Sequence, residues 1–212
     1  MAVEVDALVI GNPNNPDGKR FPRRQLLEMA RQLNARRGWL VVDEAFADAD
    51  GNGESLADIA GGPAAANIVV LRSLGKFFGL AGARVGFVIA HDSILVSLAE
   101  AVGPWALAHP SRLAAVAALA DREWQEAQGT RVRHDGVRLH ELLVASGLGD
   151  SSGTALFRYL VIDDALELYE TFARQGILLR YFSDPVAVRF GLPANEVQWQ
   201  RLVVALDQWK NR

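Results

Sequence analysis

Cysteine is absent from the 212 residues, which excludes disulfides and thiolate metal sites. The four histidines show no HExxH motif or similar ligand spacing, so no metal site is expected. No apolar run reaches the roughly 18 residues that a membrane span needs. The N-terminal stretch MAVEVDALVIG lacks the basic region of a signal peptide. We therefore expect a chain that binds neither metal nor membrane, and a cytoplasmic location is compatible with the missing cysteines.

A strong excess of one charge is missing too. The 22 Lys and Arg residues nearly balance the 25 Asp and Glu residues, and the net charge is −3. Both signs are interspersed, so no basic face indicates nucleic-acid binding. Half of the residues are hydrophobic, which is enough for a sizeable core, and the length suits one large domain or one and a half small ones.

The first half of the chain predicts an α/β architecture. Its apolar, β-branched segments alternate with helical or loop segments, which is typical of parallel sheets built from βαβ units. The parallel arrangement is expected for at least the first three segments, and the fourth, if it is antiparallel, begins with Arg84 at the edge where the others end. Because the segments lack polar alternation, we expect both faces of the sheet to be covered. A helix with apolar residues at helical spacing is predicted to end at Gly38. The four predicted strands are residues 5–11, 39–46, 67–75 and 84–90.

The second half changes in pattern. Residues 93–144 are helical except for a break at GPWALAHP. Three strand-like segments follow (ALFRYLVI, GILLRYF and VAVRFGLP), with a helix capped by Asp163 and Asp164 and a last helix capped by Asn195. We predict a large domain over residues 1–148 and a small α+β domain over 149–212, with the boundary in the turn-rich stretch 146–154.

Polar side chains gather where the predicted strands end. Ligands of open α/β sheets bind outside the carboxyl ends of the strands. An amide, a carboxylate, a hydroxyl, an amine and a guanidinium could converge there, which suits a small anionic heterocyclic cofactor held by an amine. The candidates are Asn12, Asn14, Asn15, Asp43, Glu44, Ser73, Lys76 and Arg84.

Three motifs make this prediction specific. NPNNPDG, VVDEAF and SLGKFFGLAGARVGF, in that order, resemble the fold-type-I pyridoxal-phosphate enzymes, in particular the histidinol-phosphate aminotransferase-like branch. The resemblance covers essentially the whole chain. It implies part of an aspartate aminotransferase-like large domain with a mostly parallel sheet, followed by a small C-terminal α+β domain.

The resemblance also assigns roles. Lys76 is the catalytic lysine that anchors the aldehyde of pyridoxal 5′-phosphate covalently. Asp43 faces the pyridine nitrogen and Asn15 bonds the phenolic oxygen. Ser73 and Arg84 hold the cofactor phosphate, for which guanidinium geometry is well suited.

Two further arginines imply the substrate. By the same resemblance, Arg189 binds the substrate carboxylate and Arg180 contacts a second anionic group, so a small phosphorylated amino acid is expected.

A narrower resemblance concerns the reaction. The chain is similar to the threonine-phosphate decarboxylases of cobalamin biosynthesis in the stretches VVDEAFAD, LRSLGKFFGLAG, GPWA and VRFGLP. This resemblance implies a pyridoxal-phosphate-dependent lyase that converts L-threonine O-3-phosphate to aminopropanol phosphate. It also implies that the enzyme is a homodimer.

Alternatives stay open at this point. An aminotransferase of the histidinol-phosphate type differs only in how the substrate is placed, although Phe46 stands where many aminotransferases carry a tyrosine. The chain begins after the N-terminal part of the family fold, so a non-catalytic fragment is a third possibility. Among single residues, Glu44 is interpreted as structural, and Trp105 either lines a pocket or packs in the core.

Overall fold

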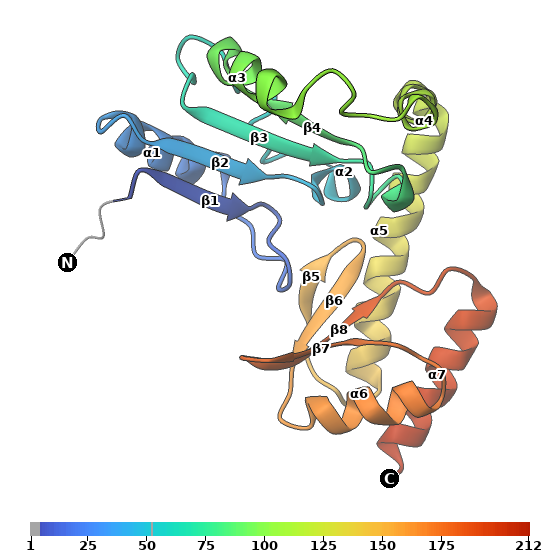
Figure 1. Cartoon of the computed structure of the whole chain (residues 1–212). Coiled ribbons are helices and arrows are strands. Elements are labelled where there is room, and N and C mark those ends of the chain that lie inside the picture. The colour runs from blue at the N-terminus through green and yellow to red at the C-terminus, as the bar shows by residue number, and fades with distance from the viewer. Residues whose placement is uncertain (1–4, 52) are drawn as a thin grey trace. The chain divides into compact units, whose positions relative to one another are not determined.

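The computed structural model describes residues 5–51 and 53–212, which form two compact units (Figure 1). Unit 1 contains residues 5–14 and Arg20–Gly129. Unit 2 contains Asn15–Lys19 and Thr130–Arg212, so a five-residue loop near the N-terminus packs with the C-terminal part. The predicted domain boundary at residues 148 and 149 stays a prediction.

Unit 1 is built on a four-stranded sheet in which spatial order follows chain order, β1-β2-β3-β4. The first three strands are parallel, as predicted, and the fourth, whose direction the sequence left open, pairs antiparallel with β3. The parallel strands therefore direct their carboxyl ends to the same edge of the sheet. The strands are β1 (Ala7–Gly11), β2 (Trp39–Asp43), β3 (Ile68–Ser73) and β4 (Gly86–Ile89).

Helices connect and follow these strands. The long helical region is interrupted between α3 and α4, where the sequence contains GPWALAHP. The helical elements are α1 (Arg23–Asn34), α2 (Ala47–Asp50), the short 3-10 helix η1 (Ala81–Ala83), α3 (Asp92–Val102), α4 (His109–Ala120) and α5 (Arg122–Ala145).

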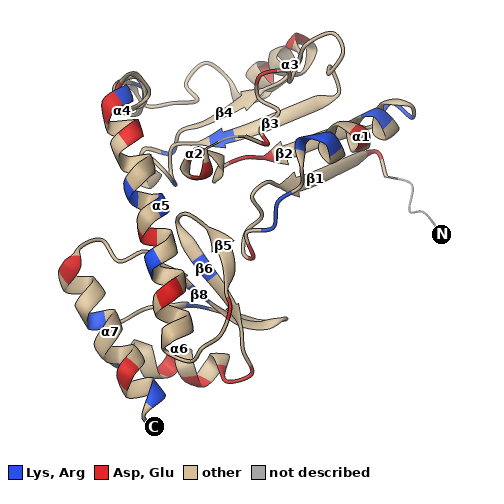
Figure 2. Cartoon of the chain, turned by 180° about the vertical axis from the view of Figure 1, so that it is seen from behind, with Lys and Arg blue, Asp and Glu red and all other residues tan. Residues whose placement is uncertain are grey.

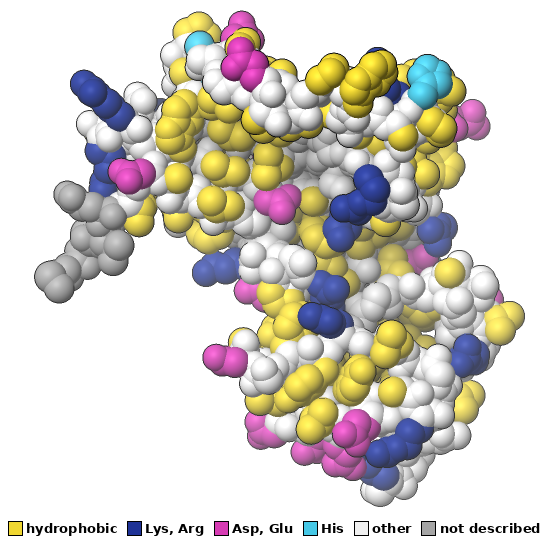
Figure 3. Space-filling model, in the orientation of Figure 1, with side chains coloured by type: hydrophobic (Ala, Val, Ile, Leu, Met, Phe, Trp, Pro, Cys, Tyr) yellow, Lys and Arg dark blue, Asp and Glu magenta, His cyan; other side chains and the backbone are white. Residues whose placement is uncertain are grey.

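One face of the sheet in unit 1 carries the core. Leu26, Ala30 and Leu33 recur at helical spacing on α1 and are buried against alternate residues of β2 and β3. The opposite face is covered in part: Val69 of β3 is buried, and Trp39 of β2 lines a pocket together with α3, whereas Val9 of β1 is 69% exposed. Hydrophobic side chains are visible at the surface of this unit in Figure 3. The expectation of two covered faces therefore holds for the inner part of the sheet and not for β1 among the described residues.

The end of α1 also differs from the prediction. The helix ends at Asn34, and Arg37 rather than Gly38 adopts the left-handed conformation, with φ of 61°. The Gly38 N–H donates to the Leu33 carbonyl over 2.8 Å and so satisfies a carbonyl of the last turn. Gly38 is needed for space, since a Cβ there would lie 2.9 Å from the Asp6 carbonyl oxygen.

Unit 2 contains an antiparallel sheet in the order β5-β6-β8-β7. Its core joins the sheet to three helices through large side chains such as Phe172, Phe190 and Trp199. Besides part of α5, its elements are β5 (Ser152–Thr154), β6 (Phe157–Val161), α6 (Ala165–Arg174), β7 (Arg180–Ser183), β8 (Val186–Gly191) and α7 (Glu196–Lys210).

Of the two helix caps predicted in unit 2, the cap of α7 is confirmed and the cap of α6 is not. The Asn195 side chain accepts a hydrogen bond from the Gln198 N–H over 3.0 Å, which confirms the predicted cap of α7. Asp164 stands at the cap position of α6 without a side-chain cap bond. Its carboxylate pairs instead with Arg212 at 2.9 Å, so the predicted aspartate cap is wrong. Within the described residues, no helix is long and apolar enough to cross a membrane.

Candidate active site

Four of the predicted site residues lie in unit 1, around the carboxyl ends of its strands. Asp43 is the last residue of β2 and Ser73 the last of β3. Lys76 follows in the turn after β3, and Arg84 lies between η1 and β4. Because β4 is antiparallel, it begins at this same edge, with Gly86 opposite Ser73. The topology therefore brings these residues to one edge, as the sequence predicted.

The Lys76 turn is fixed by aromatic packing. Phe77 and Phe78 are buried, and their rings lie 5.6 and 5.9 Å from the ring of Trp124 on α5. Lys76 itself is exposed, and its Nζ lies 5.3 Å from the centroid of the Phe46 ring. Nothing in the sequence pattern pointed to Trp124, which lies far along the chain from the lysine.

Asp43 presents an available carboxylate. Its side chain is exposed, and Oδ1 accepts a hydrogen bond from the Ala45 N–H over 3.0 Å. No ion pair joins it to a cation in the part of the chain that the structure describes. Such a carboxylate can hold a protonated ring nitrogen through a charge-assisted hydrogen bond.

Ser73 and Arg84 supply donors for an anion. The Ser73 Oγ accepts from the Gly75 N–H over 3.0 Å, which leaves the hydroxyl proton to donate elsewhere. Arg84 has φ of 55°, and its Nη1 donates to the Ala81 carbonyl over 3.1 Å. Neither Arg84 nor Lys76 forms an ion pair with a carboxylate among residues 5–51 and 53–212.

Space exists beside these donors. A Cβ built on Gly79 or Gly82 would meet no atom within 4 Å, so the backbone between Lys76 and Arg84 is bordered by open volume. A carboxylate, an amine, a hydroxyl and a guanidinium at one edge of the sheet match the ring nitrogen, aldehyde and phosphate of pyridoxal 5′-phosphate. The residues present in unit 1 therefore fit this cofactor.

The other three predicted residues belong to unit 2. Asn15 lies in the loop Asn15–Lys19, Arg180 begins β7 and Arg189 lies on β8. The Arg189 Nη1 donates to the Asn15 Oδ1, a contact between residues 174 positions apart. A guanidinium can only donate, so the amide oxygen faces Arg189 and the Asn15 NH₂ group is left for another acceptor. The sequence offered no signal for this contact.

Arg180 and Arg189 lie side by side. They are register partners on β7 and β8, and the nearby charge of Arg180, after burial, lowers the pKa of Arg189. Each guanidinium lies near an aromatic ring, with Arg189 5.0 Å from Phe157 and Arg180 5.8 Å from Phe182. Neither has a carboxylate ion-pair partner among the described residues. Two adjacent positive charges of this kind favour the binding of an anion.

Tyr159 is the β6 register partner of Arg189 and is buried. Burial raises the pKa of its phenol, and the charges of Asp17 and Asp184 raise it further. Above the unfolded-state value of about 10, the unfolded chain loses this proton while the folded chain keeps it. This contribution to stability is therefore fully present below pH of about 10 and falls as pH rises through the folded-state pKa.

We expect Tyr159→Phe to remove the decrease in the free energy of unfolding that Tyr159 causes at alkaline pH. Ultraviolet titration of the folded chain should show a tyrosine that ionises above the usual pH, and the variant should lack that component. Urea unfolding at successive alkaline pH values measures the accompanying change in the free energy of unfolding. An unchanged late component in the variant would contradict the assignment.

Several residues have structural roles instead. The Asn12 side chain is buried and exchanges two hydrogen bonds with the Phe21 backbone, at 2.9 and 3.2 Å. Glu44 is fully buried and bonded, as its structural interpretation requires. Trp105 is 92% exposed, so packing in the core is wrong for it. The residues described here contain no cluster of three or more His, Cys, Asp or Glu that could hold a metal ion.

Several known proteins are similar to this chain in sequence. The profile of the family aminotransferase class I and II matches residues 2–208. The chain is 45% identical over 206 residues to a threonine-phosphate decarboxylase of Pseudomonas aeruginosa, covering 97% of this chain and 61% of that protein. It is 33% identical to a histidinol-phosphate aminotransferase of Mycobacterium tuberculosis, covering 99% of this chain and 57% of that one. The chain thus spans about three-fifths of the length of these relatives.

Solved structures share the fold. The histidinol-phosphate aminotransferase from Clostridium acetobutylicum superimposes with a TM-score of 0.89 at 22% identity, over 98% of this chain and 64% of that chain. The enzyme from Sinorhizobium meliloti, solved with pyridoxal-5′-phosphate, gives 0.87 at 21% identity, over 97% and 57%. The predicted fold and, at the level of the family, the predicted cofactor are confirmed. The chain belongs to the aminotransferase class I and II family.

Proposed function

We propose that this chain binds pyridoxal 5′-phosphate through Lys76 and forms part of a decarboxylase of L-threonine O-3-phosphate. The observation that carries the proposal is the set of Asp43, Ser73, Lys76 and Arg84 around one sheet edge, in which no described side chain neutralises any of the three charged groups. The 45% identity to a threonine-phosphate decarboxylase supports the choice of reaction.

Each residue has a defined task in this proposal. When bound, pyridoxal phosphate supplies an electron sink for the bond that breaks at the substrate α-carbon. Asp43 holds the proton on the ring nitrogen, and Asn15 donates its amide to the phenolic oxygen. Ser73 and Arg84 orient the phosphate. The Lys76 amine forms the covalent link, and once released it can move a proton to or from the substrate carbon.

The arginines of unit 2 supply the substrate site. Arg189 binds the carboxylate and Arg180 the phosphate group of the substrate, since a bound dianion relieves the repulsion between these adjacent guanidiniums. The proposal includes a homodimer in the cytoplasm, which the family resemblance supports and which sedimentation and cell fractionation test.

A histidinol-phosphate aminotransferase is the second candidate. The 33% identity to such an enzyme favours it, and it uses the same cofactor residues in this scheme. Product analysis separates the two candidates. Carbon dioxide release from L-threonine O-3-phosphate supports the decarboxylase, whereas amino transfer to 2-oxoglutarate supports the aminotransferase. A chain that binds the cofactor but does neither, alone or with the N-terminal part of a relative added, is non-catalytic.

Covalent labelling tests the cofactor site. The chain contains three lysines, so the protein is mixed with pyridoxal phosphate, reduced with borohydride and mapped by mass spectrometry. Before reduction we expect a visible absorption band, and after reduction we expect one adduct, on Lys76. Lys76→Ala should lose both, and Lys19→Ala, which removes another exposed lysine, should lose neither. Equal labelling of Lys19, Lys76 and Lys210, or labelling unchanged by Lys76→Ala, would contradict the proposal.

A further inference from the structure

We propose that Glu44, Ser55 and Arg72, here called the strand-end cluster, act as positioning residues that hold Asp43 and Ser73 in place for the cofactor. This inference rests on the proposed function, because it assigns a task to residues next to the proposed cofactor ligands. The cluster itself touches neither substrate nor cofactor in the scheme above.

The argument starts from strand geometry. Successive side chains of a strand point to opposite faces. Asp43 pairs with Leu71, so Asp43 and Ser73 share one face of the sheet. Glu44 and Arg72, their immediate neighbours in sequence, therefore lie on the other face. The Glu44 N–H also donates to the Leu71 carbonyl over 2.9 Å, which extends the pairing of β2 and β3 past Asp43. Figure 2 shows acidic residues, in red, at the end of β2 and a basic residue, in blue, at the end of β3.

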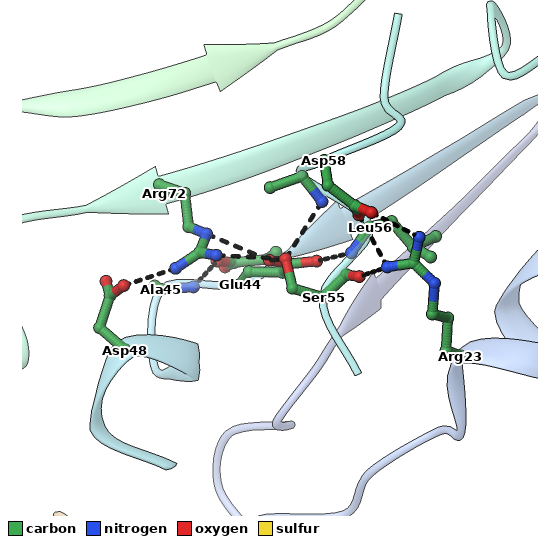
Figure 4. Close-up of polar contacts among 10 residues, drawn as sticks. Arg23, Glu44, Ala45, Asp48, Ser55, Leu56, Asp58 and Arg72 are labelled. Atoms are coloured by element: carbon green, nitrogen blue, oxygen red, sulfur yellow. Dashed lines mark hydrogen bonds and ion pairs between the residues drawn. The ribbon is translucent and has the colours of Figure 1, made fainter. Parts of the chain in front are cut away.

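On that second face, Glu44 is held from three sides (Figure 4). Its side chain is fully buried. Oε1 accepts from the Leu56 N–H over 2.8 Å, and Oε2 accepts from the Ser55 hydroxyl over 2.6 Å. The Arg72 Nε lies 3.1 Å from the same Oε2. Both oxygens are therefore engaged, as a buried carboxylate requires.

Arg72 completes the cluster. Its Nη1 pairs with the Asp48 carboxylate at 2.6 Å, and its Nη2 donates to the Ser55 Oγ over 3.1 Å. The guanidinium thus donates hydrogen bonds to Asp48 of α2 and to Ser55, and it forms an ion pair with Glu44. These contacts tie the segments that follow β2 to the end of β3, directly behind Asp43 and Ser73.

A role in positioning explains this arrangement better than a role in stability. The sheet already has an apolar core below the cluster, which includes Val42 and Val70. A buried ion pair adds little net stability compared with apolar packing, because both charges lose their hydration. It does require one geometry, since any displacement of either strand end leaves a buried charge without its partner. Ligand sites need such a supporting layer to hold their geometry.

Glu44→Gln tests the inference because it keeps the size of the side chain and removes its charge. The full chain is first shown to be folded by far-ultraviolet circular dichroism. We expect its dissociation constant for pyridoxal phosphate to rise about 10-fold. The visible circular dichroism of the bound cofactor should change, and amide exchange at residues 73–79 should accelerate without cofactor. Arg72→Lys, which keeps the charge but loses the planar fork, should act in the same direction.

Two controls separate positioning from stability. Leu33→Ala removes a buried side chain from the end of α1 that precedes the start of β2, and Glu28→Gln removes the exposed ion pair with Arg31. Both should leave cofactor affinity and the visible spectrum unchanged while the chain is folded. The inference is wrong if Glu44→Gln leaves affinity, spectrum and exchange unchanged, or if Leu33→Ala alters them equally. If the unaltered chain takes no cofactor, the proposed function fails, and exchange at residues 73–79 still decides the inference.

Discussion

Replacing Gly18 with alanine is expected to lower the free energy of unfolding of unit 2 by about 3 kcal/mol. Gly18 has φ of +71°, where an L side chain costs energy. A Cβ would also lie 2.2 to 2.4 Å from the carbonyl oxygen, carbonyl carbon and Cα of Gly153. These are backbone atoms of β5 and cannot turn away. The loop Asn15–Lys19 must therefore move off the sheet and take Asn15 from Arg189.

Amide hydrogen exchange at β6 and β8, measured in increasing urea, reports this loss for unit 2 alone. Gly147→Ala is the matched control. Gly147 lies in the same unit with φ of +80°, but its Cβ would meet nothing within 4 Å. It should therefore cost only the conformational part, about 1 kcal/mol. Equal losses in the two variants would show that the contact with Gly153 carries no energy.

Trp199→Ala is expected to cost about 3 to 5 kcal/mol in the same unit. Trp199 is 2% exposed in the core, and the Arg138 guanidinium lies 4.2 Å from its ring centroid. The variant leaves a large cavity and removes the support of that guanidinium. Arg138 keeps its ion pair with Glu196 on α7, which limits how far the helix can close the cavity.

Urea unfolding measures the loss, with Trp105→Ala as the control. Trp105 is 92% exposed, so its removal should change the free energy of unfolding by less than about 0.5 kcal/mol. Trp199→Phe should fall between the two, because it retains part of the buried ring. A loss in Trp199→Ala no larger than in Trp105→Ala would contradict the assigned packing.

Elements with strong local patterns were predictable from the sequence. The four strands of unit 1 follow from short β-branched runs between turn signals, and α7 follows from Asn195 and Gln198. Features set by distant partners were not. Asp164 has the right type for a cap, but Arg212 captures its carboxylate. The strand β5 was not predicted, because it lies in a turn-rich stretch. Its pairing with β6, rather than the propensity of its residues, makes it a strand.

The candidate site shows the same division. Residues at strand ends are placed by the order of the strands, so the amino-acid pattern alone was enough to group Asp43, Ser73, Lys76 and Arg84. Their roles came from the family resemblance and not from pattern alone. Contacts such as Arg189 with Asn15, or the burial of Glu44 against Ser55, depend on how separate segments pack. No periodicity in one sequence encodes such contacts.

The membership of Asn15–Lys19 in unit 2 has a consequence for how the chain is synthesised. A ribosome releases this loop early, but Gly153 and Arg189, against which it packs, emerge much later. The loop must wait undocked while the segments of unit 1 on either side of it are already available to fold. For the same reason, no single cut in the chain separates the two units, and a recombinant fragment that begins at Thr130 would lack the strand cover that this loop provides.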